Sequence, residues 1–421
     1  MPRGPPPPRG RLAVRCGRLT GADGRPVSLA GVSLFWSQWM GHLYSAEVVA
    51  HLAKDFGATL VRAALGVHES SGYLHDPETE SSKVFRVVDA AIQHGMYAII
   101  DWHSHEAHTQ LDEAAAFFSL AAKRYTGCAN VIYELWNEPL EVPWGTVKDY
   151  AERIIGEIRA HDKDNLIVVG TPRWSQAVDL AASAPLSDPN VAYALHFYAG
   201  THGAELRAAA ERALAKGACL FVTEWGAVEA SGDGAVAHES VGEWVDFLRR
   251  HGLSHAAWAL STKAEGASIL QPHAGASPLA WTEESLTESG RTIRAILRGW
   301  SLDHRPGGTT DGAVEVWWPG EGVKVYGVQP FKLVLRRSDG AVADADGYEA
   351  WWSVDGGMRN AMGTASEPGS GCRHKEFMCN MDGWKWRGRP GHHGPFSIAF
   401  TCIDRGASTS VTATRTIYTV G

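Results

Sequence analysis

The sequence lacks both a long apolar run and a basic block. None of its apolar stretches approaches the roughly 20 residues that a membrane-spanning helix needs. Its 39 basic and 47 acidic side chains give a formal net charge of −8 over 421 residues. A strongly positive patch is the usual signature of proteins that bind nucleic acids or anionic lipids. We therefore expect no nucleic-acid partner and no membrane partner.

Cysteine is scarce as well. The chain has 6 cysteines, and no two of them have the Cys-x-x-Cys spacing of a zinc ribbon. Cys372, Cys379 and Cys402 lie in the last quarter, where a disulfide would suit an exported protein. Their pairing is open, because an odd number leaves one cysteine unpaired unless it reaches across domains.

The first ten residues are rich in proline and contain no apolar core of the kind found in a signal peptide. We expect residues 1–10 to form a disordered leader, and we expect no signal peptide in this sequence.

Tryptophan, in contrast, is abundant, with 17 in the chain. Indole rings are large, flat and amphipathic, so they stack on sugar rings as well as filling a core. The composition therefore favours a carbohydrate ligand, although many of these rings will be core.

Strand-like and helix-like segments alternate through the first three quarters of the chain. The eight expected strands are residues 29–33, 59–63, 98–102, 131–135, 166–169, 192–195, 220–223 and 256–260. Eight strand–helix units over about 270 residues predict an α/β fold, a (β/α)8 TIM barrel, at residues 11–300. A doubly wound sheet is the alternative, but no glycine-rich turn follows the first strand.

Local signals predict where some of these elements begin and end. We expect residues 12–29 to form a hairpin that turns at Asp23-Gly24. Ser45 should cap a helix that ends at Gly57, and Thr146 should cap a later one. The last helix of the barrel is expected at residues 283–298.

Beyond residue 300 the helical periodicity disappears. Pro306 opens a Pro-Gly-Gly-Thr-Thr segment, which predicts a linker at residues 301–311. The expected strands beyond it are residues 314–317, 323–326, 331–336, 349–354, 396–401 and 410–418. Short alternating strands predict a small all-β, immunoglobulin-like sandwich at residues 312–421.

The tryptophans of this second domain have two interpretations. They occur as the pairs Trp317-Trp318 and Trp351-Trp352 and as Trp384-Lys-Trp386. They form either a sugar-binding face or part of the sandwich core, and period-two alternation would bury one residue of each adjacent pair.

Two of the barrel strands end in a glutamate. The run that starts at Val131 ends in Asn137-Glu138-Pro139, and the run that starts at Leu220 carries Glu224. Because proline cannot continue a β-ladder, we expect Glu138 at the C-terminal rim of its strand. That rim is where barrel enzymes carry their catalytic residues.

The other strands bring further polar and aromatic side chains to the same rim. They are Trp36, Arg62, His103, Asn137, His196, Tyr198, Trp258, Lys263 and Glu265. Residues that serve only the stability of the barrel would be aliphatic at this rim, so this ring of polar and aromatic side chains predicts a binding cleft.

Two carboxyl groups in such a cleft suit glycoside hydrolysis. One carboxylic acid protonates the leaving oxygen, and the other carboxylate attacks the anomeric carbon or activates water. A separation of about 5 Å indicates retention of configuration, and about 6.5–9.5 Å indicates inversion. Arg62 beside one of the glutamates would hold it ionised, as a nucleophile requires.

Several runs resemble one enzyme family. Ile132-Tyr-Glu-Leu-Trp-Asn-Glu-Pro139 and Thr223-Glu-Trp-Gly226 resemble glycoside hydrolase family 5, the endo-β-1,4-glucanase or cellulase family. Gly31–Ser37, Ile99–His103 and Trp258–Glu265 resemble its bacterial cellulase branch. The resemblance covers about residues 12–298.

The resemblance implies a role for each residue of the rim. Glu138 corresponds to the acid/base and Glu224 to the nucleophile. The residues that correspond to those around the reacting sugar are Arg62, His103, Asn137, His196 and Tyr198. Trp258 corresponds to a stacking platform, Lys263 and Glu265 to ligands of a more distant sugar, and Trp36 to a stacking residue at the non-reducing end.

The sequence also departs from the family pattern in two places. Trp136 stands where a smaller residue is expected, and Thr262 stands where aspartate is more usual. Neither residue belongs to the expected chemistry, but both leave the shape of the cleft open.

Some rim residues have competing interpretations. Glu134 lies deeper in its strand than Glu138, so we expect a buried, hydrogen-bonded carboxylate. His103, His105 and His108 suggest a metal site, but they miss the His-Glu-x-x-His zinc spacing, so we expect no metal and place His105 and His108 in a loop at the cleft. Whether Trp174 lines the cleft is open.

The sequence thus predicts a secreted, monomeric, retaining endo-β-1,4-glucanase that hydrolyses internal bonds of cellulose or mixed-linkage β-glucan without a cofactor. A β-mannanase or xyloglucanase on the same barrel is the first alternative. A non-catalytic carbohydrate-binding protein is the second.

Overall fold

The structure is a computed structural model of the chain. It describes residues 4–15, 17–68, 70–300, 302, 313–319, 323–325, 328–336, 342–343, 348–355, 358–364, 377–382, 394–404 and 410–419. The chain divides into two compact units, residues 1–304 and 305–421. Each unit is described by itself.

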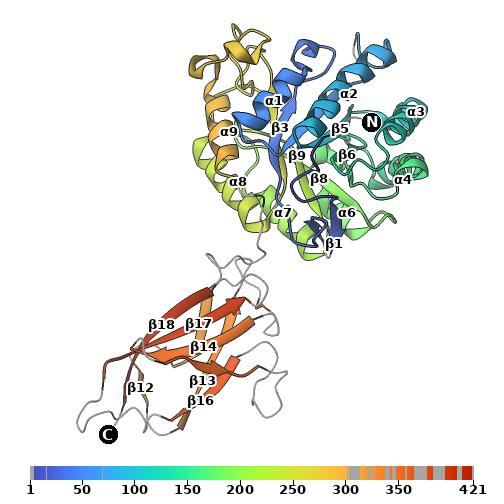
Figure 1. The fold of residues 1–421 in the computed structure, drawn as a ribbon. Helices are drawn as coiled ribbons and strands as arrows, with labels where there is room; N and C mark the ends of the chain where they lie inside the picture. The colour runs from blue at the N-terminus through green and yellow to red at the C-terminus, as the bar shows by residue number, and fades with distance from the viewer. Residues whose placement is uncertain are drawn as a thin grey trace. The chain divides into compact units, whose positions relative to one another are not determined.

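The first unit is a closed barrel of eight parallel strands, which confirms the predicted (β/α)8 fold (Figure 1). In order around the barrel, the strands are β10 (His255–Leu260), β3 (Ala30–Leu34), β4 (Leu60–Gly66), β5 (Tyr97–His103), β6 (Val131–Glu134), β7 (Ile167–Val169), β8 (Val191–Tyr198) and β9 (Leu220–Gly226). Helices cover the outer face of the barrel, so the strands are buried on both faces and their sequences are almost uniformly apolar. The charged residues Arg62, Asp101, Glu134 and Glu224 break this pattern, and all four are buried.

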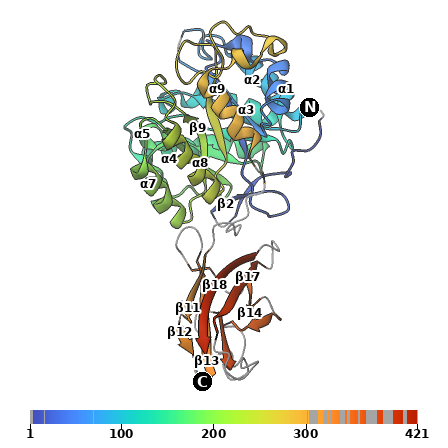
Figure 2. The same cartoon turned by 90° about the vertical axis from the view of Figure 1, so that its left-hand side faces the viewer.

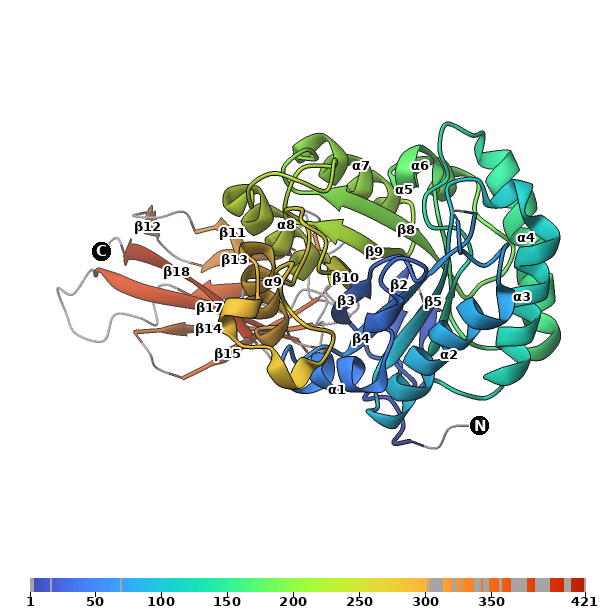
Figure 3. The same cartoon turned by 90° about the horizontal axis from the view of Figure 1, so that it is seen from above.

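The helices form an outer ring around the strands (Figure 3). They are α1 (Ala46–Lys54), α2 (Pro77–Gln93), α3 (Leu111–Arg124), α4 (Trp144–His161), α5 (Pro172–Ser175), α6 (Val178–Ser183), α7 (Ala204–Ala215), α8 (His238–His251) and α9 (Glu288–Arg298). Figure 2 shows α7, α8 and α9 from the outside of this ring. Within the described residues, no helix is both long and apolar enough to cross a membrane.

The predicted helix ends are partly right. The hydroxyl of Ser45 accepts a hydrogen bond from the backbone N–H of Val48, so Ser45 does cap α1. Thr146 is not a cap, because α4 begins two residues earlier at Trp144, after Pro143. The last helix is also shorter than predicted, because residues 283–285 form a separate 3-10 turn and α9 begins at Glu288.

The N-terminal segment packs on the barrel. Strands β1 (Ala13–Arg15) and β2 (Arg18–Thr20) pair antiparallel, so the first reversal comes earlier than Asp23-Gly24, which forms the following turn. Gly10 accepts a hydrogen bond of 2.7 Å from the Tyr97 hydroxyl. The expected disorder of the leader therefore does not extend to the described residues 4–10.

The second unit is all-β, as predicted. One sheet contains β11 (Ala313–Trp318), β13 (Val328–Arg336) and β16 (Phe377–Asp382). The other contains β12 (Val323–Val325), β18 (Ser410–Thr419), β17 (Phe396–Asp404), β14 (Tyr348–Val354) and β15 (Asn360–Met362). The sequence analysis did not predict β15 and β16.

Apolar side chains from both sheets form one core. Phe331 packs edge-to-face on Trp352 at 5.2 Å and on Phe400 at 5.3 Å between ring centroids. Trp352 is buried and Trp351 is half-buried, as period-two alternation predicts for this pair. Cys402 lies in this core, whereas Cys372, Trp384 and Trp386 lie outside the described residues. Cys402 is a free thiol in this core, and the pairing of Cys372 and Cys379 stays open.

Candidate active site

Glu138 and Glu224 meet at the C-terminal rim of the barrel. Glu138 lies in the loop that follows β6, and Glu224 lies in β9. A carboxylate oxygen of Glu138, a carboxylate oxygen of Glu224 and a ring nitrogen of His196 all lie within 4.8 Å of one another. The two glutamates, 86 positions apart in the sequence, can therefore contact the same small group on a substrate.

Arg62 links most of the buried acids of the site. Its guanidinium lies inside the barrel on β4 and is completely buried. It donates to Glu134 Oε2 at 2.6 Å, Asn137 Oδ1 at 2.7 Å, Glu224 Oε2 at 3.1 Å and Ser33 Oγ at 3.2 Å. It also forms an ion pair of 3.0 Å with Asp101 Oδ2. Burial lowers the pKa of Arg62, but the surrounding carboxylates raise it above its ordinary value. Arg62 is therefore a permanent cation that fixes the positions of these groups.

Glu224 is held from two sides. Arg62 binds Oε2, and the Tyr198 hydroxyl donates to Oε1 at 2.9 Å. The pKa of Glu224 is raised, because burial and the charge of Glu138 outweigh the lowering by His196 and Arg62, so Arg62 does not by itself set the ionisation of this glutamate as expected. With each oxygen bonded to a different residue, the carboxylate keeps a single orientation.

Glu138 contacts two histidines. His196 Nδ1 lies 3.0 Å from Oε1, and His105 Nε2 lies 3.4 Å from Oε2. Burial raises the pKa of Glu138, but the contacts with His105 and His196 dominate and lower it to about 2. Burial lowers the pKa of His196, but Glu134, Glu138 and Glu224 together raise it to about 9. In the free protein, the ionisable proton nearest to Glu138 is thus carried by His196.

His103 and two indole rings form one wall of the site. His103 Nδ1 lies 2.7 Å from Asp101 Oδ2, and burial lowers the pKa of His103 well below its usual value. A neutral ring that donates through Nδ1 leaves Nε2 as an acceptor. Trp258 stacks on His103 at 5.0 Å with an interplanar angle of 1°, and Trp36 packs edge-on at 4.3 Å.

The outer part of the rim is more exposed. Lys263 forms an ion pair of 2.5 Å with Glu265, and its ammonium lies 5.6 Å from the centroid of the Phe35 ring. Trp39 is 48% exposed and lies 5.1 Å from Trp36 between ring centroids. Both groups of side chains can contact a ligand that extends beyond the two glutamates.

Trp174 lies in an unusual turn. Arg173, Trp174 and Ser175 all have positive φ angles, between 54° and 58°, which side chains other than glycine rarely adopt. Trp174 is 43% exposed, and its backbone N–H bonds the carbonyl of Pro139, next to Glu138. Trp136, in contrast, is completely buried and stacks on His108 at 5.1 Å between ring centroids, so the Trp136 ring is not free at the rim.

Sequence reasoning missed three contacts of the site. Glu134 is buried, as expected, but Thr223 connects it to His196, which the strand pattern gave no reason to expect. Asp101 orients His103, although an aspartate inside a strand carries no signal of its own. His105 was predicted only as a loop residue at the cleft, and it contacts Glu138.

Glu138, His196 and Glu224 also offer three metal-ligand atoms to one point. The fixed guanidinium of Arg62, 3.1 Å from Glu224, already neutralises charge there and repels a divalent cation. For this reason we interpret the cluster as a set of acid–base groups and not as a metal site.

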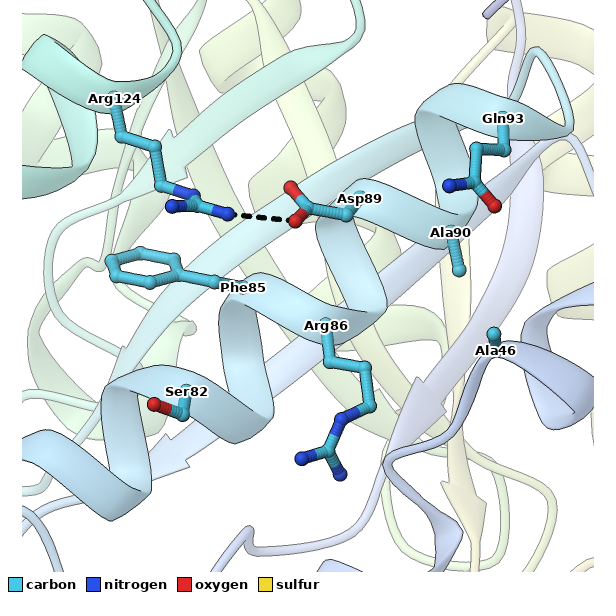
Figure 4. A pocket seen from close by; sticks show the side chains of 8 residues that line it. All are labelled: Ala46, Ser82, Phe85, Arg86, Asp89, Ala90, Gln93 and Arg124. Atoms are coloured by element: carbon cyan, nitrogen blue, oxygen red, sulfur yellow. Dashed lines mark hydrogen bonds and ion pairs between the residues drawn. The ribbon is translucent and has the colours of Figure 1, made fainter. Parts of the chain in front are cut away.

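A hollow of about 310 Å³ lies elsewhere, between α1, α2 and α3 (Figure 4). Its most polar groups are already engaged, since Arg124 forms an ion pair of 2.7 Å with Asp89 and lies over the Phe85 ring. None of the predicted site residues lines it, so the rim remains the candidate site.

Comparison with known proteins agrees with this geometry. The model of the family "Cellulase (glycosyl hydrolase family 5)" matches residues 20–264. Endoglucanase Z of Dickeya dadantii is 52% identical over 283 residues, which are 66% of this chain and 64% of that protein. Endoglucanase A of Evansella cellulosilytica is 43% identical over 282 residues, which are 65% of this chain and 57% of that protein. The matched region thus spans less than two thirds of the length of these relatives.

Solved structures show the same similarity. A structure from Cytophaga hutchinsonii has 46% identity and a TM-score of 0.68, and covers 69% of this chain and 95% of its own. The catalytic domain of a Thermobifida fusca endoglucanase has 32% identity and a TM-score of 0.67, and covers 69% of this chain and 98% of its own. Another structure of that endoglucanase, a variant in complex with cellotetraose, is 31% identical and covers 69% of this chain and 98% of its own. The chain therefore belongs to the cellulase family, glycosyl hydrolase family 5.

Proposed function

We propose that this protein is a retaining endo-β-1,4-glucanase that hydrolyses internal bonds of cellulose or mixed-linkage β-glucan. The observation that carries the proposal is the approach of Glu138 and Glu224 to within 4.8 Å. Inverting glycosidases hold their carboxyl groups about 6.5–9.5 Å apart to admit a water, whereas retaining ones need about 5 Å. The gap here suits direct attack by a carboxylate.

The reaction proceeds in two steps. Glu138 gives a proton to the glycosidic oxygen as Glu224 attacks the anomeric carbon, so the leaving chain departs as an alcohol and a glycosyl–enzyme ester forms. Glu138, now a carboxylate, then takes a proton from the incoming water, which displaces Glu224 from the sugar. The configuration at the anomeric carbon is inverted twice and so retained.

The groups around the glutamates support these roles. Arg62 and Tyr198 hold Glu224 in place for attack. Asn137 accepts from Arg62 through Oδ1, so its amide N–H₂ is left to donate to a sugar hydroxyl. A hydrogen bond to the 2-hydroxyl strengthens in the transition state.

The remaining rim residues are suited to binding the sugar chain. Trp258 and Trp36 both pack against His103, and Nε2 of His103 can accept from a hydroxyl. Lys263 and Glu265 offer a donor and an acceptor further out. The relatives that are called endoglucanases, and the cellotetraose held by the Thermobifida fusca variant, favour a β-1,4-glucan over mannan or xyloglucan.

We propose further that the protein acts outside the cell, because an insoluble polymer is out of reach of an enzyme inside it. We also propose that it acts as a monomer. For the second unit we propose an immunoglobulin-like topology. The support is its two sheets, whose apolar side chains share one core.

Two variants test the proposed function. Glu224→Gln and Glu138→Gln should each keep the fold and lose almost all release of reducing ends from carboxymethyl-cellulose. Glu157→Gln, at a partly exposed position on α4 where the side chain pairs with Arg153, is the matched control and should keep full activity. Near-normal activity of Glu224→Gln would refute the proposal. Sugar binding by a wild-type protein that releases no reducing ends would favour the non-catalytic alternative, and faster hydrolysis of mannan than of lichenan would favour the mannanase.

A further inference from the structure

A line of hydrogen bonds runs from Glu134 to Glu138 behind the catalytic cleft. The Thr223 hydroxyl lies 2.5 Å from Glu134 Oε1 and 2.9 Å from His196 Nε2. His196 Nδ1, on the other side of the ring, lies 3.0 Å from Glu138 Oε1. Glu134 Oε1 is 3.7 Å from Nε2, beyond hydrogen-bond distance, so Thr223 bridges the two residues.

The number of available hydrogens fixes the direction of each bond. Arg62 donates to Glu134 Oε2 at 2.6 Å, and the pKa of Glu134 is lowered despite its burial, mainly by the charge of Arg62. An ionised carboxylate only accepts, so the single hydrogen of the Thr223 hydroxyl must point to Glu134. The Thr223 oxygen can then only accept from His196, and Nε2 must carry a hydrogen.

From this geometry we propose that Thr223 and Glu134 are positioning residues that keep a proton on Nε2 of His196, so that Nδ1 and Glu138 share the one proton that the reaction moves. The inference rests on the proposed function, because it takes Glu138 as the acid/base. His196 then acts as the store for the proton that Glu138 delivers.

The proton balance follows from this arrangement. Before cleavage, His196 Nδ1 and Glu138 together hold one mobile proton, on either atom. Cleavage moves that proton to the leaving oxygen, which also receives the electron pair of the broken C–O bond. The neutral ring now presents a lone pair on Nδ1 to the Glu138 carboxylate, which makes the carboxylate a stronger base. Glu138 takes a proton from the attacking water, and the pair is restored.

Without Thr223 the neutral His196 ring can adopt a second tautomer. Its hydrogen can move to Nδ1 and bond the Glu138 carboxylate, which stabilises the deprotonated form. The acid form of Glu138 would then be lost at lower pH. Thr223 excludes the Nδ1–H tautomer, because that tautomer needs a donor to Nε2 and the Thr223 oxygen has no hydrogen left to give.

Other charged groups gather around His196 and its partners from neighbouring strands and loops. They are Arg62, Asp101, His103, His105, Glu134, Glu138 and Glu224. None of them replaces the contact of Thr223 with Nε2, which is the closest polar contact of that atom. Removal of the hydroxyl therefore breaks the two bonds of Thr223, to Glu134 and to His196, and leaves these charges in place.

Thr223→Val, which has nearly the same shape, is the test variant. For phenyl β-cellobioside, whose leaving oxygen needs a proton, kcat/KM should fall about tenfold at about pH 10, above the pKa of about 9 of His196, and change little at pH 7. For 2,4-dinitrophenyl β-cellobioside, whose leaving group needs none, kcat/KM should change by less than about twofold. The alkaline limb of the pH profile for the phenyl substrate should move down by about one pH unit.

Two controls separate this role from a structural one. Thr223→Ser keeps the hydroxyl and should restore both substrates to within about twofold of the wild type. Thr20→Val removes a buried hydroxyl that donates to the Ala13 carbonyl at 2.9 Å, and should change neither substrate. Equal losses of kcat/KM on the two substrates in Thr223→Val, or no loss on either, would overturn the inference while the proposed function stands. A wild-type protein that hydrolyses neither substrate would overturn both.

A measurement on the unaltered protein covers the case in which Thr223→Val does not fold. Nitrogen-15 NMR of the histidine rings, with the His196 signals assigned from the spectrum of His196→Asn, should show Nε2 protonated from about pH 5 to pH 10. A deprotonated Nε2 at any pH in that range would overturn the inference.

Discussion

Ser175 donates a hydrogen bond of 2.8 Å to the backbone carbonyl of Asn137, the residue before Glu138. The same hydroxyl accepts from the backbone N–H of Thr171 at 3.3 Å. The turn that contains Ser175 has three consecutive residues in the left-handed region, and such strain persists only where the surrounding structure holds it. The turn after β7 and the loop that carries Glu138 are therefore fixed to one another.

Ser175→Ala should reduce catalysis more than it reduces binding. Loss of this buried bond costs about 1 kcal/mol of folding stability and lets the segment around Glu138 shift. Because small displacements of a catalytic group are costly, we expect kcat on cello-oligosaccharides to fall about tenfold with KM nearly unchanged. Steady-state kinetics and thermal melting measure both effects. Ser183→Ala, which removes an exposed hydroxyl bond to the Asp179 carbonyl, is the control. An unchanged kcat in Ser175→Ala would show that the turn does not position Glu138.

Arg62→Lys should strongly destabilise the barrel although it keeps the charge. A lysine cannot reproduce the fork that binds Glu134, Asn137 and Glu224, and it leaves buried carboxylates without partners. Breaking a buried ion pair in this way costs about 3–5 kcal/mol. Denaturant unfolding checks this value. Arg153→Lys, an exposed residue of α4 that pairs with Glu157, should change stability by less than about 0.5 kcal/mol. Comparable effects of the two substitutions would contradict the role assigned to Arg62.

Stability should fall on the alkaline side in a window set by His196. Its folded pKa of about 9 lies above the ordinary value of about 6.5, because Glu134, Glu138 and Glu224 outweigh burial. A raised pKa contributes stability that is complete below about pH 6.5 and lost as the pH rises through about 9. The shift corresponds to about 3 kcal/mol. We expect His196→Asn to be less stable than the wild type by this amount at pH 6 and equally stable above about pH 9.5. A constant difference across the whole range would show that the imidazolium contributes nothing.

The sequence was sufficient to predict the barrel and the two glutamates. Each of the eight strands is an apolar run of the right length, and the family motifs mark Glu138 and Glu224. The apolar runs and the motifs both lie in short stretches of the sequence, so they can be recognised without knowledge of the packing. The all-β class of the second unit also followed from period-two alternation, although strands β15 and β16 were missed.

Other features depend on contacts between distant segments and could not be predicted. Thr223 lies 89 positions from Glu134, and nothing in either strand indicates that the two side chains bond. Nothing in the sequence around Ser175 indicates that its turn is left-handed, and the turn bonds residues 137–140. Helix α9 begins later than predicted because Thr287 caps it, accepting from the backbone N–H of Gly290. In each case a tertiary contact overrides the local pattern.

The most direct test of the account is to trap the covalent intermediate. A 2,4-dinitrophenyl 2-deoxy-2-fluoro-β-cellobioside should inactivate the protein in step with release of dinitrophenol, because the fluorine slows both steps while the good leaving group speeds only the first, so the intermediate accumulates. Peptide mapping by mass spectrometry should then find one fluorocellobiosyl group, on Glu224. Rapid turnover without labelling, or a label on any other residue, would contradict the claim that Glu138 and Glu224 act together on one glycosidic bond by double displacement.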